Sequence, residues 1–531
     1  MFAGFRFSRT WVGRPWAWAK PEGMLLLLAF AGLATSGARA VNISDQKLVV
    51  DVKELASPAA DGSLGAVLAQ GPDGTVYLAW MEPAGARGTA LKFAALDAYR
   101  KRWSEPRLIA QGPDLWADAE NTPALAVQAA GRMLAVWPVV GTATGKTTLP
   151  DTPGRSVWSR SDDGGLTWSA PQPLSRESEV TEFATAISLA DGRFLAAWLD
   201  GRAKSSDRRQ LWARIVGPEG PDQLVDPSVC PGCPLALVPF PDGSASLAYR
   251  GRTEGGIRDH FIARFNNDRW EAPTPLGREG WKPAAEGPAD GPRLAADGPR
   301  MGAAWFTAAD DEPRVLVSTS PDAGTLWTMA QRADLGHPAG RVDTLLLRDG
   351  SQYVLWLEDR GEDESQPAGI YLRRYNGFGG AMMPARLAAD GPAQVSGVPR
   401  LTLVKDDDVS GPAQLLLVYT QAGPPARVRA LIATLPSTAE LMEMDIDCPC
   451  SAGKEIAVGY GVKGFILAVD GEGHRLRVQH GPIPGLMRGG ELAVRVAPAV
   501  AAAVQPGRGF LARLEKRGGE WWIFDVRLLG R

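Results

Sequence analysis

The most regular feature of the sequence is a hydrophobic phrase that recurs seven times. Most copies begin at a glycine turn, and all continue as a short apolar run that ends in an aromatic residue. Further strand-like runs and turns lie between the copies, without helical windows. The aromatic residues lie 51 to 63 residues apart: Trp80, Trp137, Trp198, Tyr249, Trp305, Trp356 and Tyr419. Short strands at a long period predict an all-β chain that forms a β-propeller of seven blades, or of six if one hairpin is an insertion.

The pattern also indicates how the ring closes. Each unit reads as two buried strands, a loop, a third strand and a fourth strand, which in several copies opens with Trp. The seventh copy has only three such strands, whereas residues 47–55 form a strand-like run without a hairpin partner. We therefore expect residues 47–55 to supply the outer strand of the last blade.

The first forty residues have the pattern of an export signal. Basic residues precede the apolar stretch Met24–Ala34, and Ala38-Arg39-Ala40 forms a cleavage site of small residues. The apolar stretch is too short to cross a bilayer core of about 30 Å, and no later window reaches the length of a membrane span. The sequence therefore predicts a signal peptide at 1–40 and a mature chain, without a membrane span, in the periplasm or outside the cell.

Composition and charge exclude two classes of protein. The chain has 57 Lys and Arg against 60 Asp and Glu, a net charge of −3, which argues against nucleic-acid binding. Only four histidines are present, so a histidine-rich metal site is excluded. Glycine and proline are frequent, with 61 and 42 residues, as expected for a chain with many turns.

The four cysteines form two close pairs in a chain that we expect to be exported. Cys230-Pro-Gly-Cys233 is consistent with a local structural disulfide, which we favour, with a redox pair, or with ligands of a soft metal. Cys448 and Cys450 follow Met442 and Met444 in a short acidic segment. A disulfide between Cys448 and Cys450 would be strained, so free thiols or a metal are more plausible for this second pair.

Two hairpins carry a specific turn motif, S-x-D-x-G-x-T-W. Asp can turn such a hairpin by accepting backbone N–H groups, and glycine supplies positive φ. The motif positions are Ser161, Asp163, Gly165, Thr167 and Trp168 in the first copy, and Ser320, Asp322, Gly324 and Trp327 in the second, where Leu326 replaces the threonine. This motif is the Asp-box, and residues 45–435 resemble the sialidase (neuraminidase) and BNR-repeat superfamily. The resemblance implies a sialidase-type propeller in which the Asp-boxes are structural.

The resemblance also allows a test for sialidase chemistry. Sialidases hold the carboxylate of the sugar with three arginines, and they use an acid/base Asp and a Tyr nucleophile. The first of these arginines belongs to an Arg-Ile-Pro phrase in the first blade. No such phrase occurs here, and the first arginine of the mature chain, Arg87, lies in Gly-Ala-Arg-Gly. We therefore expect a binding protein, with an exo-α-sialidase-like hydrolase or a protein-interaction scaffold as the alternatives.

Charged residues nevertheless follow the aromatic strand in three blades. Because these loops are equivalent in their blades, they should meet on one face around the axis. They are candidates for binding an anionic glycan or a protein ligand, or they are solvated and ion-paired loop residues. The candidates are Asp200, Arg202, Arg250, Arg252, Arg258, Asp259, Glu358 and Arg360.

Residues 230–312 resemble more narrowly a group of secreted bacterial proteins that are described as sialidase-like. The shared phrases are the Cys230/Cys233 cluster, Tyr249–Arg252, Ile257–Asp259, Gly280–Lys282 and Ala304–Ala309. In one respect the chain departs from this group, because Glu286 stands where a further cysteine is expected.

The pattern changes after residue 435. Residues 436–454 form a linker rich in Met and Cys, and five strand-like runs follow within 455–531, as in an OB-type barrel. The phrase His480-Gly-Pro-Ile-Pro-Gly-Leu-Met487 resembles the CusF-type periplasmic copper-binding domain, which implies Cu(I) as a bound soft cation. The two Met ligands of that family's next strand are missing, because Gly490, Glu491 and Leu492 stand there. Candidate ligands are therefore Cys448, Cys450, His480, Met487, Met442 and Met444, with a linker of packed methionines and oxidised cysteines as the alternative.

Overall fold

The structure is a computed structural model of the chain. It describes residues 47–140, 154–203, 208–217, 220–283, 290–361, 367–377, 379–406, 411–438, 440–441, 460–470, 474–481, 483, 487–496, 500–501, 504–517 and 520–528. The expected signal peptide, Glu286, and the candidate ligands Met442, Met444, Cys448 and Cys450 lie outside these residues. Within them, no helix is long and apolar enough to cross a membrane.

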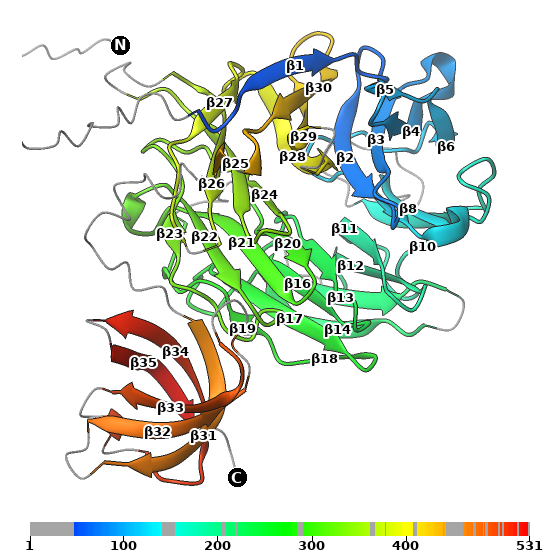
Figure 1. The fold of residues 1–531 in the computed structure, drawn as a ribbon. Coiled ribbons are helices and arrows are strands. Elements are labelled where there is room, and N and C mark those ends of the chain that lie inside the picture. The colour runs from blue at the N-terminus through cyan, green and yellow to red at the C-terminus, as the bar shows by residue number, and fades with distance from the viewer. Residues whose placement is uncertain are drawn as a thin grey trace, which may run out of the picture. The chain divides into compact units, whose positions relative to one another are not determined.

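Seven antiparallel sheets of four or five strands follow one another along the chain as blades 1 to 7 (Figure 1). Their strands are β2 (Leu64–Gln70), β3 (Val76–Pro83), β4 (Thr89–Asp97), β5 (Arg102–Trp103) and β6 (Arg107–Gly112) in blade 1; β7 (Ala124–Val127), β8 (Met133–Val139), β9 (Arg155–Ser161) and β10 (Gln172–Pro173) in blade 2; β11 (Thr181–Ser188), β12 (Phe194–Asp200), β13 (Arg209–Ile215) and β14 (Gln223–Val229) in blade 3; and β15 (Ala236–Pro239), β16 (Ala245–Arg250), β17 (His260–Asn266), β18 (Arg269–Trp270) and β19 (Thr274–Pro275) in blade 4.

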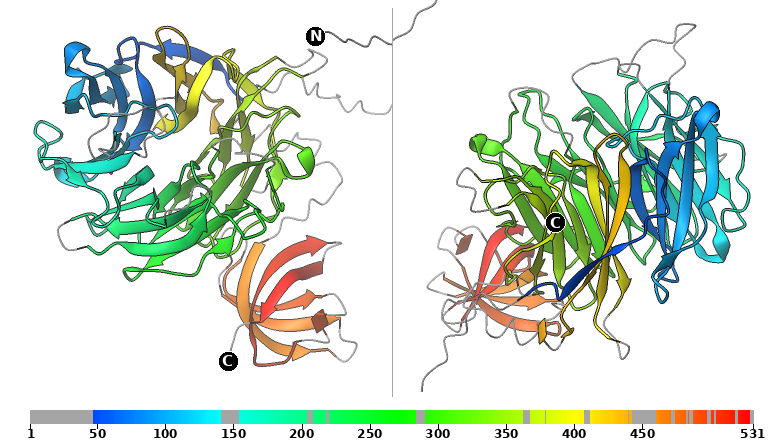
Figure 2. Two further views of the ribbon diagram at one scale, coloured as in Figure 1. Left: turned by 180° about the vertical axis from the view of Figure 1, so that it is seen from behind. Right: turned by 90° about the horizontal axis from the view of Figure 1, so that it is seen from above.

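The remaining strands of the ring are β20 (Arg293–Asp297), β21 (Arg300–Thr307), β22 (Arg314–Ser320) and β23 (Gln331–Arg332) in blade 5; β24 (Asp343–Leu346), β25 (Gln352–Glu358), β26 (Gly369–Tyr375) and β27 (Ala385–Ala388) in blade 6; and β28 (Val395–Lys405), β29 (Gln414–Gln421), β30 (Arg427–Thr434) and β1 (Asp51–Leu55) in blade 7. The first strand of each blade lies next to the first strands of the two neighbouring blades, and β28 lies next to β2 (Figure 2). The seven sheets therefore form a closed ring, and the predicted all-β, seven-bladed propeller is confirmed.

The last blade contains strands from both ends of the propeller. Strand β1 pairs antiparallel with β30, from Asp51 opposite Thr434 to Leu55 opposite Ala430. The order within the sheet is β1-β30-β29-β28, so β1 is the outermost strand (Figure 1). The expected closure by residues 47–55 is confirmed.

The recurrent aromatic phrase forms the second strand of each blade. This strand lies between the first and third strands of its own sheet, and both its faces pack against neighbouring sheets. Every residue of β8, β12 and β25 is buried, and Trp80, Trp198 and Trp305 are 0% exposed. A strand that is buried on both faces is apolar throughout, which explains why the phrase was visible in the sequence.

The first Asp-box is a hydrogen-bonded turn between β9 and β10. Asp163 Oδ1 accepts the N–H groups of Leu166 (3.0 Å) and Thr167 (2.9 Å), and Oδ2 accepts the Thr167 hydroxyl (2.6 Å). Ser161 Oγ accepts the N–H of Gly165 at 2.8 Å. Gly165 has φ of 79°, and a Cβ there would lie 2.3 Å from the Phe93 ring, so this position requires glycine.

The second Asp-box has the same turn, but its carboxylate accepts two bonds fewer, because the Thr325 N–H donates to the Asp322 carbonyl at 3.3 Å and Leu326 replaces the threonine. Asp322 Oδ1 accepts the N–H of Leu326 at 2.8 Å, and Ser320 Oγ accepts the N–H of Gly324 at 2.8 Å. Leu326 has no hydroxyl, so the bond that Thr167 makes in the first copy is missing. Trp327 packs against the hydrophobic core between blades 4 and 5. Both motifs thus stabilise turns and packing between blades.

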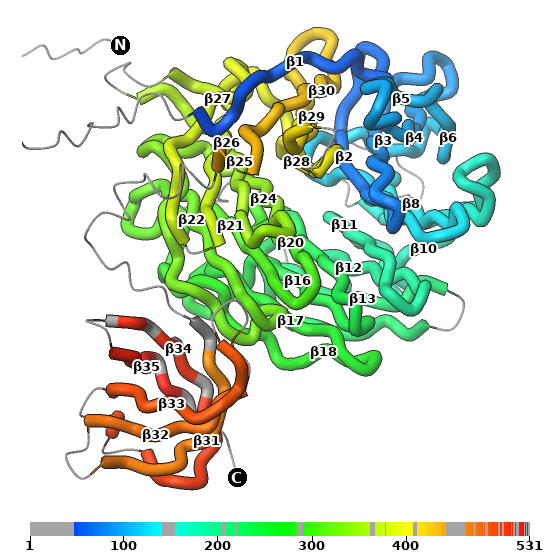
Figure 3. Tube along the Cα trace, in the orientation of Figure 1, coloured from blue at the N-terminus to red at the C-terminus, as the bar shows by residue number. Residues whose placement is uncertain are grey.

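The C-terminal region is a closed five-stranded barrel (Figure 3). Its strands are β31 (Tyr460–Val469), β32 (Arg475–His480), β33 (Gly490–Arg495), β34 (Gly509–Arg517) and β35 (Glu520–Leu528), in the order β31-β32-β33-β35-β34. Strands β33 and β35 pair in parallel and the other pairs are antiparallel. Val462, Val478 and Phe510 lie in its core, each at most 1% exposed. The predicted five strands are confirmed.

Candidate functional site

The first strands of all seven blades surround an open cavity of about 390 Å³ on the axis of the ring. Its walls are mostly aliphatic, from residues such as Val67, Val127 and Leu237. Charged side chains enter where the first strands begin, at Arg293 in β20 and Asp343 in β24, together with Arg400 in β28 and Glu120 just before β7. Polar atoms nevertheless contribute more of the cavity surface than apolar atoms do, so charged and polar groups converge on an aliphatic framework.

The two arginines of the cavity share one acidic neighbour. Arg293 is 6% exposed, and one of its guanidinium nitrogens donates to the Leu235 carbonyl at 3.3 Å. Burial, with repulsion from Arg400, lowers the pKa of Arg293 to about 9. Burial also lowers the pKa of Arg400, although Asp343 opposes the shift. The charged forms of both arginines would gain from an additional anion.

The carboxylates of the cavity are also disfavoured as anions. Burial raises the pKa of Asp343 even though Arg400 and Arg293 lie near it, and Oδ2 of Asp343 accepts the Leu401 N–H at 2.8 Å. Burial raises the pKa of Glu120 as well, with Arg341 opposing the shift and Asp118 adding to it. In both carboxyl groups the effect of burial thus outweighs the attraction of the neighbouring arginines.

Phe183 lines the cavity in an unusual backbone conformation. Its φ is 51°, which non-glycine residues rarely adopt, at a bulge of β11 between Glu182 and Thr185. The Phe183 N–H donates to Asn121 Oδ1 at 2.9 Å, so the side chain of a neighbouring blade holds the bulge. The strain places an aromatic ring among the residues that line the cavity.

The eight candidates of the polar loops do not line this cavity; they end the second strands of blades 3, 4 and 6 or lie after them. Asp200 is 0% exposed and accepts the indole N–H of Trp198 at 2.8 Å. Glu358, also 0% exposed, accepts the indole N–H of Trp356 in the same way. Glu82 repeats the arrangement in blade 1 with Trp80, at 2.6 Å. These carboxylates hold buried tryptophans of their own blades.

Arg202 is engaged in ion pairs and stacking within blade 3. Its guanidinium pairs with Asp200 at 3.0 Å, Asp222 at 3.3 Å and Glu177 at 3.0 Å. It also lies over the Trp212 ring, 3.7 Å from the centroid. In blade 6 Arg360 is exposed, and its backbone N–H donates to Asp359. Ligand binding by these loops remains a prediction. The alternative that the sequence left open is that their charged residues are solvated or paired with one another.

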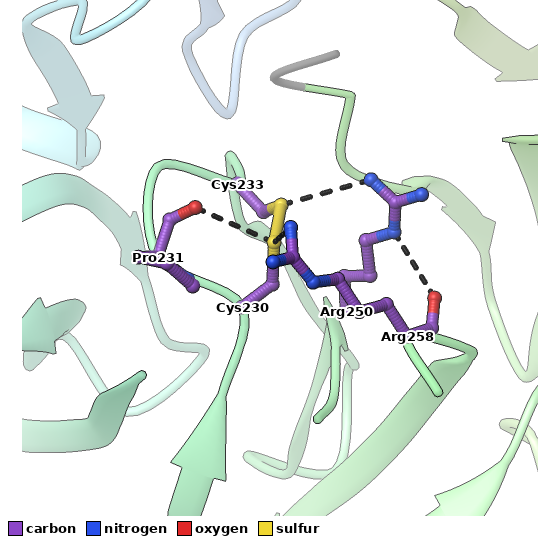
Figure 4. Close-up of a disulfide and its surroundings, with 5 residues drawn as sticks. All are labelled: Cys230, Pro231, Cys233, Arg250 and Arg258. Carbon is purple, nitrogen blue, oxygen red and sulfur yellow. Dashed lines mark hydrogen bonds between the residues drawn. A yellow bond between two sulfur atoms is a disulfide. The ribbon is translucent and has the colours of Figure 1, made fainter. Parts of the chain in front are cut away.

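The candidates of blade 4 form a cluster around a disulfide (Figure 4). Cys230 and Cys233 are bonded to each other and are 1% and 3% exposed. One guanidinium nitrogen of Arg250 lies 3.8 Å from Cys233 Sγ, and one of Arg258 lies 3.9 Å from Cys230 Sγ. Each sulfur atom therefore has its own guanidinium neighbour.

Backbone pairing brings this cluster together. The Cys230 N–H donates to the Arg250 carbonyl at 3.0 Å, and the Arg252 N–H donates to the Ser228 carbonyl at 3.1 Å. Arg250 Nε donates to the Arg258 carbonyl at 3.0 Å, which links the two arginines through the main chain. The phrases around Cys230, Tyr249 and Ile257 are thus adjacent in space.

Asp259 and Trp281 complete the cluster. Asp259 accepts the N–H groups of Gly280 (3.1 Å) and Trp281 (3.0 Å). Arg250 in turn lies over the Trp281 ring, 3.7 Å from the centroid. Phe306, from the last of the shared phrases, packs edge-on against Trp281. All five phrases of residues 230–312 therefore contribute to one cluster.

His260 lies beside this cluster in β17, where it pairs with Arg250 across the sheet. It is 1% exposed and its ring packs near Trp305. Burial and the charge of Arg250 hold the pKa of His260 well below its ordinary value. His260 therefore stays neutral.

In the barrel the structure describes two of the six metal candidates. His480 is 4% exposed, and its Nδ1 lies 2.6 Å from the Gly481 carbonyl. Met487 packs against the barrel core. Gly490 lies opposite His480 in the ladder and offers no side chain as a ligand. Among the residues described, no three His, Cys, Asp or Glu are grouped as for a metal ion.

The comparisons with known proteins concern the propeller. Residues 74–277 match the BNR repeat-like domain family. No match was found among the curated proteins.

Solved structures of low sequence identity show similarity along most of the chain. A protein of unknown function from Dyadobacter fermentans is 15% identical with a TM-score of 0.43, over 73% of this chain and 99% of that one. The Hadza microbial sialidase Hz136 is 12% identical with a TM-score of 0.37, over 70% and 66%. A mutant NanB sialidase from Streptococcus pneumoniae is 9% identical with a TM-score of 0.36, over 73% and 94%.

Sequence reasoning missed the arginines of the cavity. Arg293 and Arg400 lie 107 positions apart in the sequence, and neither belongs to a recurrent phrase. The available signal was weak: Arg293 begins β20 and Arg400 lies in the middle of β28, and an apolar residue would be ordinary at either position. Only the stacking of blades 5, 6 and 7 brings them together.

Proposed function

We propose that the chain is an exported binding protein whose propeller holds a small anionic ligand in the axial cavity. The observation that carries the proposal is the pair of cavity guanidiniums, buried Arg293 and half-buried Arg400, which share Asp343 as an acidic neighbour. A carboxylate matches the planar fork of an arginine in charge and geometry. Phe183 offers an apolar face to the rest of the ligand. An acidic sugar, with its carboxylate and its C–H face, has this chemistry.

The proposal is tested by calorimetry with sialic acid, glucuronic acid and glucose as probes. We expect the two acids to bind and glucose not to bind. Arg400→Gln should weaken binding of the acids at least tenfold, because a charge-assisted bond is lost. The matched control is Arg429→Gln on the outer strands, where Arg429 pairs with Glu54 at 2.7 Å. Equal binding by both variants, or no binding of any acid, would overturn the proposal.

Catalysis is not part of the proposal. Besides the missing Arg-Ile-Pro phrase, Tyr249 is 0% exposed and donates its hydroxyl to Asp226 at 2.6 Å. Burial, with the charge of Asp226, strongly raises the pKa of Tyr249, so it is a poor nucleophile. Release of a fluorophore from a sialoside, retained in a Tyr249→Phe variant but lost in Arg400→Gln, would instead indicate a sialidase-like hydrolase at the cavity.

A second candidate function is Cu(I) binding by the C-terminal region. A carbonyl oxygen can only accept, so the bond to Gly481 places the proton on Nδ1 of His480 and leaves the Nε2 lone pair available for a soft metal. His480 and Met487 alone make a weak site, so Cys448 and Cys450 would have to complete it.

The copper proposal is tested by competition with a Cu(I) chelator. The reduced protein should bind about one Cu(I), and replacing Cys448 and Cys450 by serine should weaken binding more than His480→Ala does, since thiolates are the softer ligands. The reverse order would place the metal on the barrel alone. Negligible binding by the wild type would leave a barrel without a metal function.

A further inference from the structure

The disulfide of blade 4 is surrounded by groups that favour its reduced form. Arg250 and Arg258 each bring a guanidinium within 4 Å of a different sulfur. A disulfide is neutral and gains little from two adjacent cations. A thiolate is an anion and gains much from them, which is why thiols beside arginine have low pKa values.

Three further titratable groups among the described residues lie close to this cluster. Asp259 lies near Arg250 but is engaged by two backbone N–H groups. Asp290 is buried and accepts the Arg341 N–H at 2.8 Å, and burial raises its pKa although Arg250, Arg341 and Arg293 oppose the shift. His260 stays neutral, because burial and the charge of Arg250 lower its pKa. Among the described residues, the guanidiniums of Arg250 and Arg258 are the charged groups in contact with the sulfurs.

The two remaining readings of the cysteine pair fit this environment less well. A soft metal ion would bring a further positive charge between two guanidiniums. As a cross-link, the bond closes a loop of sequence separation 3. So short a loop restricts the unfolded chain much less than a long one would, which limits its stabilising effect.

We propose that Cys230 and Cys233 form a redox-active pair whose co-reactant is an external thiol or dithiol. Pro234, the residue directly after Cys233, lines the axial cavity. The proposal does not depend on which ligand the cavity binds.

The reaction is thiol–disulfide exchange. A thiolate of the external dithiol attacks one sulfur, the Cys230–Cys233 bond breaks, and its electron pair leaves on the other sulfur as a thiolate beside a guanidinium. The second thiol of the co-reactant then displaces the mixed disulfide. Two electrons have passed to the protein, the co-reactant is a disulfide, and one of the two cysteines takes up a proton.

The test uses the full chain with Cys448 and Cys450 replaced by serine, so that only this pair reacts. The folded protein is equilibrated in glutathione redox buffers, and its free thiols are counted by alkylation and mass. The thiol pKa of the reduced protein is then read from thiolate absorbance against pH. We expect reduction without unfolding, and a thiol pKa at least one unit below the ordinary value of about 8.5.

The variant Arg258→Gln tests whether this arginine is the cause of the low thiol pKa. It should raise the thiol pKa and shift the glutathione equilibrium about tenfold toward the disulfide, whereas Arg258→Lys should retain most of the wild-type behaviour. The matched control is Arg264→Gln in the same blade, where Arg264 pairs with Asp242 at 3.4 Å; it should change neither quantity.

Two results would overturn the proposal. One is alkylation of Cys230 and Cys233 only under denaturing conditions, which would make the bond a structural cross-link. The other is a wild-type thiol pKa at or above about 8.5. Both measurements are made on the protein with native arginines, so they decide the matter even if an arginine variant does not fold.

Discussion

At the scale of single residues, one carboxylate can organise a whole turn. Asp163 accepts bonds from two backbone N–H groups and from the hydroxyls of Ser161 and Thr167. These bonds, that of the Thr167 hydroxyl first, lower the pKa of Asp163 to about 2. The folded state therefore binds this proton more weakly than the unfolded chain does.

The first prediction concerns the pH dependence of this turn. Asp163→Ala should lower the melting temperature at neutral pH. The difference from the wild type should be constant above the ordinary pKa of about 4 and should shrink as the pH falls toward about 2, because the stabilising carboxylate is then protonated in both states. Thermal melts of the wild type and the variant across this pH range measure the difference. The control is Asp162→Ala, which removes only an exposed ion pair between Asp162 and Arg160. A difference that grew toward low pH would contradict the assignment.

The same scale shows what sequence could and could not reveal. The Asp-box was readable because all its bonds lie within a few residues of Asp163. The roles of Arg293 and Arg400 were not readable, because they depend on strands of different blades. Around Cys230 the sequence indicated the neighbours, but not that Arg250 and Arg258 each meet one sulfur.

At the scale of strands, the second strand of several blades ends in the same hydrogen bond between a carboxylate and a tryptophan. An acidic residue at the end of the strand lies two positions after a tryptophan, as in Trp198 and Asp200 or Trp356 and Glu358. The acid is buried and accepts the indole N–H, so the large aromatic side chain is fixed between sheets without an unsatisfied donor. Charged residues after an aromatic strand therefore indicated packing as well as solvent exposure.

The second prediction separates a structural from a ligand-binding role for this acid. Asp200→Ala should cost about 2–4 kcal/mol of unfolding free energy, because the buried Trp198 N–H and the Arg202 guanidinium lose their acceptor. Asp359→Ala, in the exposed loop of blade 6, should cost less than about 0.5 kcal/mol. Denaturant unfolding followed by tryptophan fluorescence measures both. Normal stability of Asp200→Ala together with lost ligand affinity would instead support a binding role.

At the scale of the whole molecule, the period of the sequence determined the architecture more firmly than any motif. Seven similar units can bury their faces only by stacking in a ring, so counting aromatic strands was enough to predict the blades. The closing strand was predictable because β28, β29 and β30 lacked a fourth partner. The axial cavity was not, since it exists only once all seven first strands meet.

The third prediction concerns the closure. Proline at both Val52 and Lys53 should destabilise the propeller by about 3 kcal/mol or more, because one of two consecutive N–H groups in β1 must face β30. Gln172→Pro in β10, a two-residue outer strand of blade 2, should have a much smaller effect. Calorimetry measures the melting temperatures of both variants and of the wild type. Equal melting temperatures would show that β1 is not needed to hold the ring.

The pairing of β1 with β30 also has a consequence for the order of folding. Asp51 meets Thr434 across 383 positions of sequence, the kind of distant contact that slows folding because a long loop must close first. Blades 2 to 6 draw their strands from consecutive hairpins and can form as soon as those hairpins exist. Blade 7 can be completed only when the chain has been made to residue 434. Until then β1 lacks its partner, so an unfinished chain exposes a strand edge through which it could pair with another molecule.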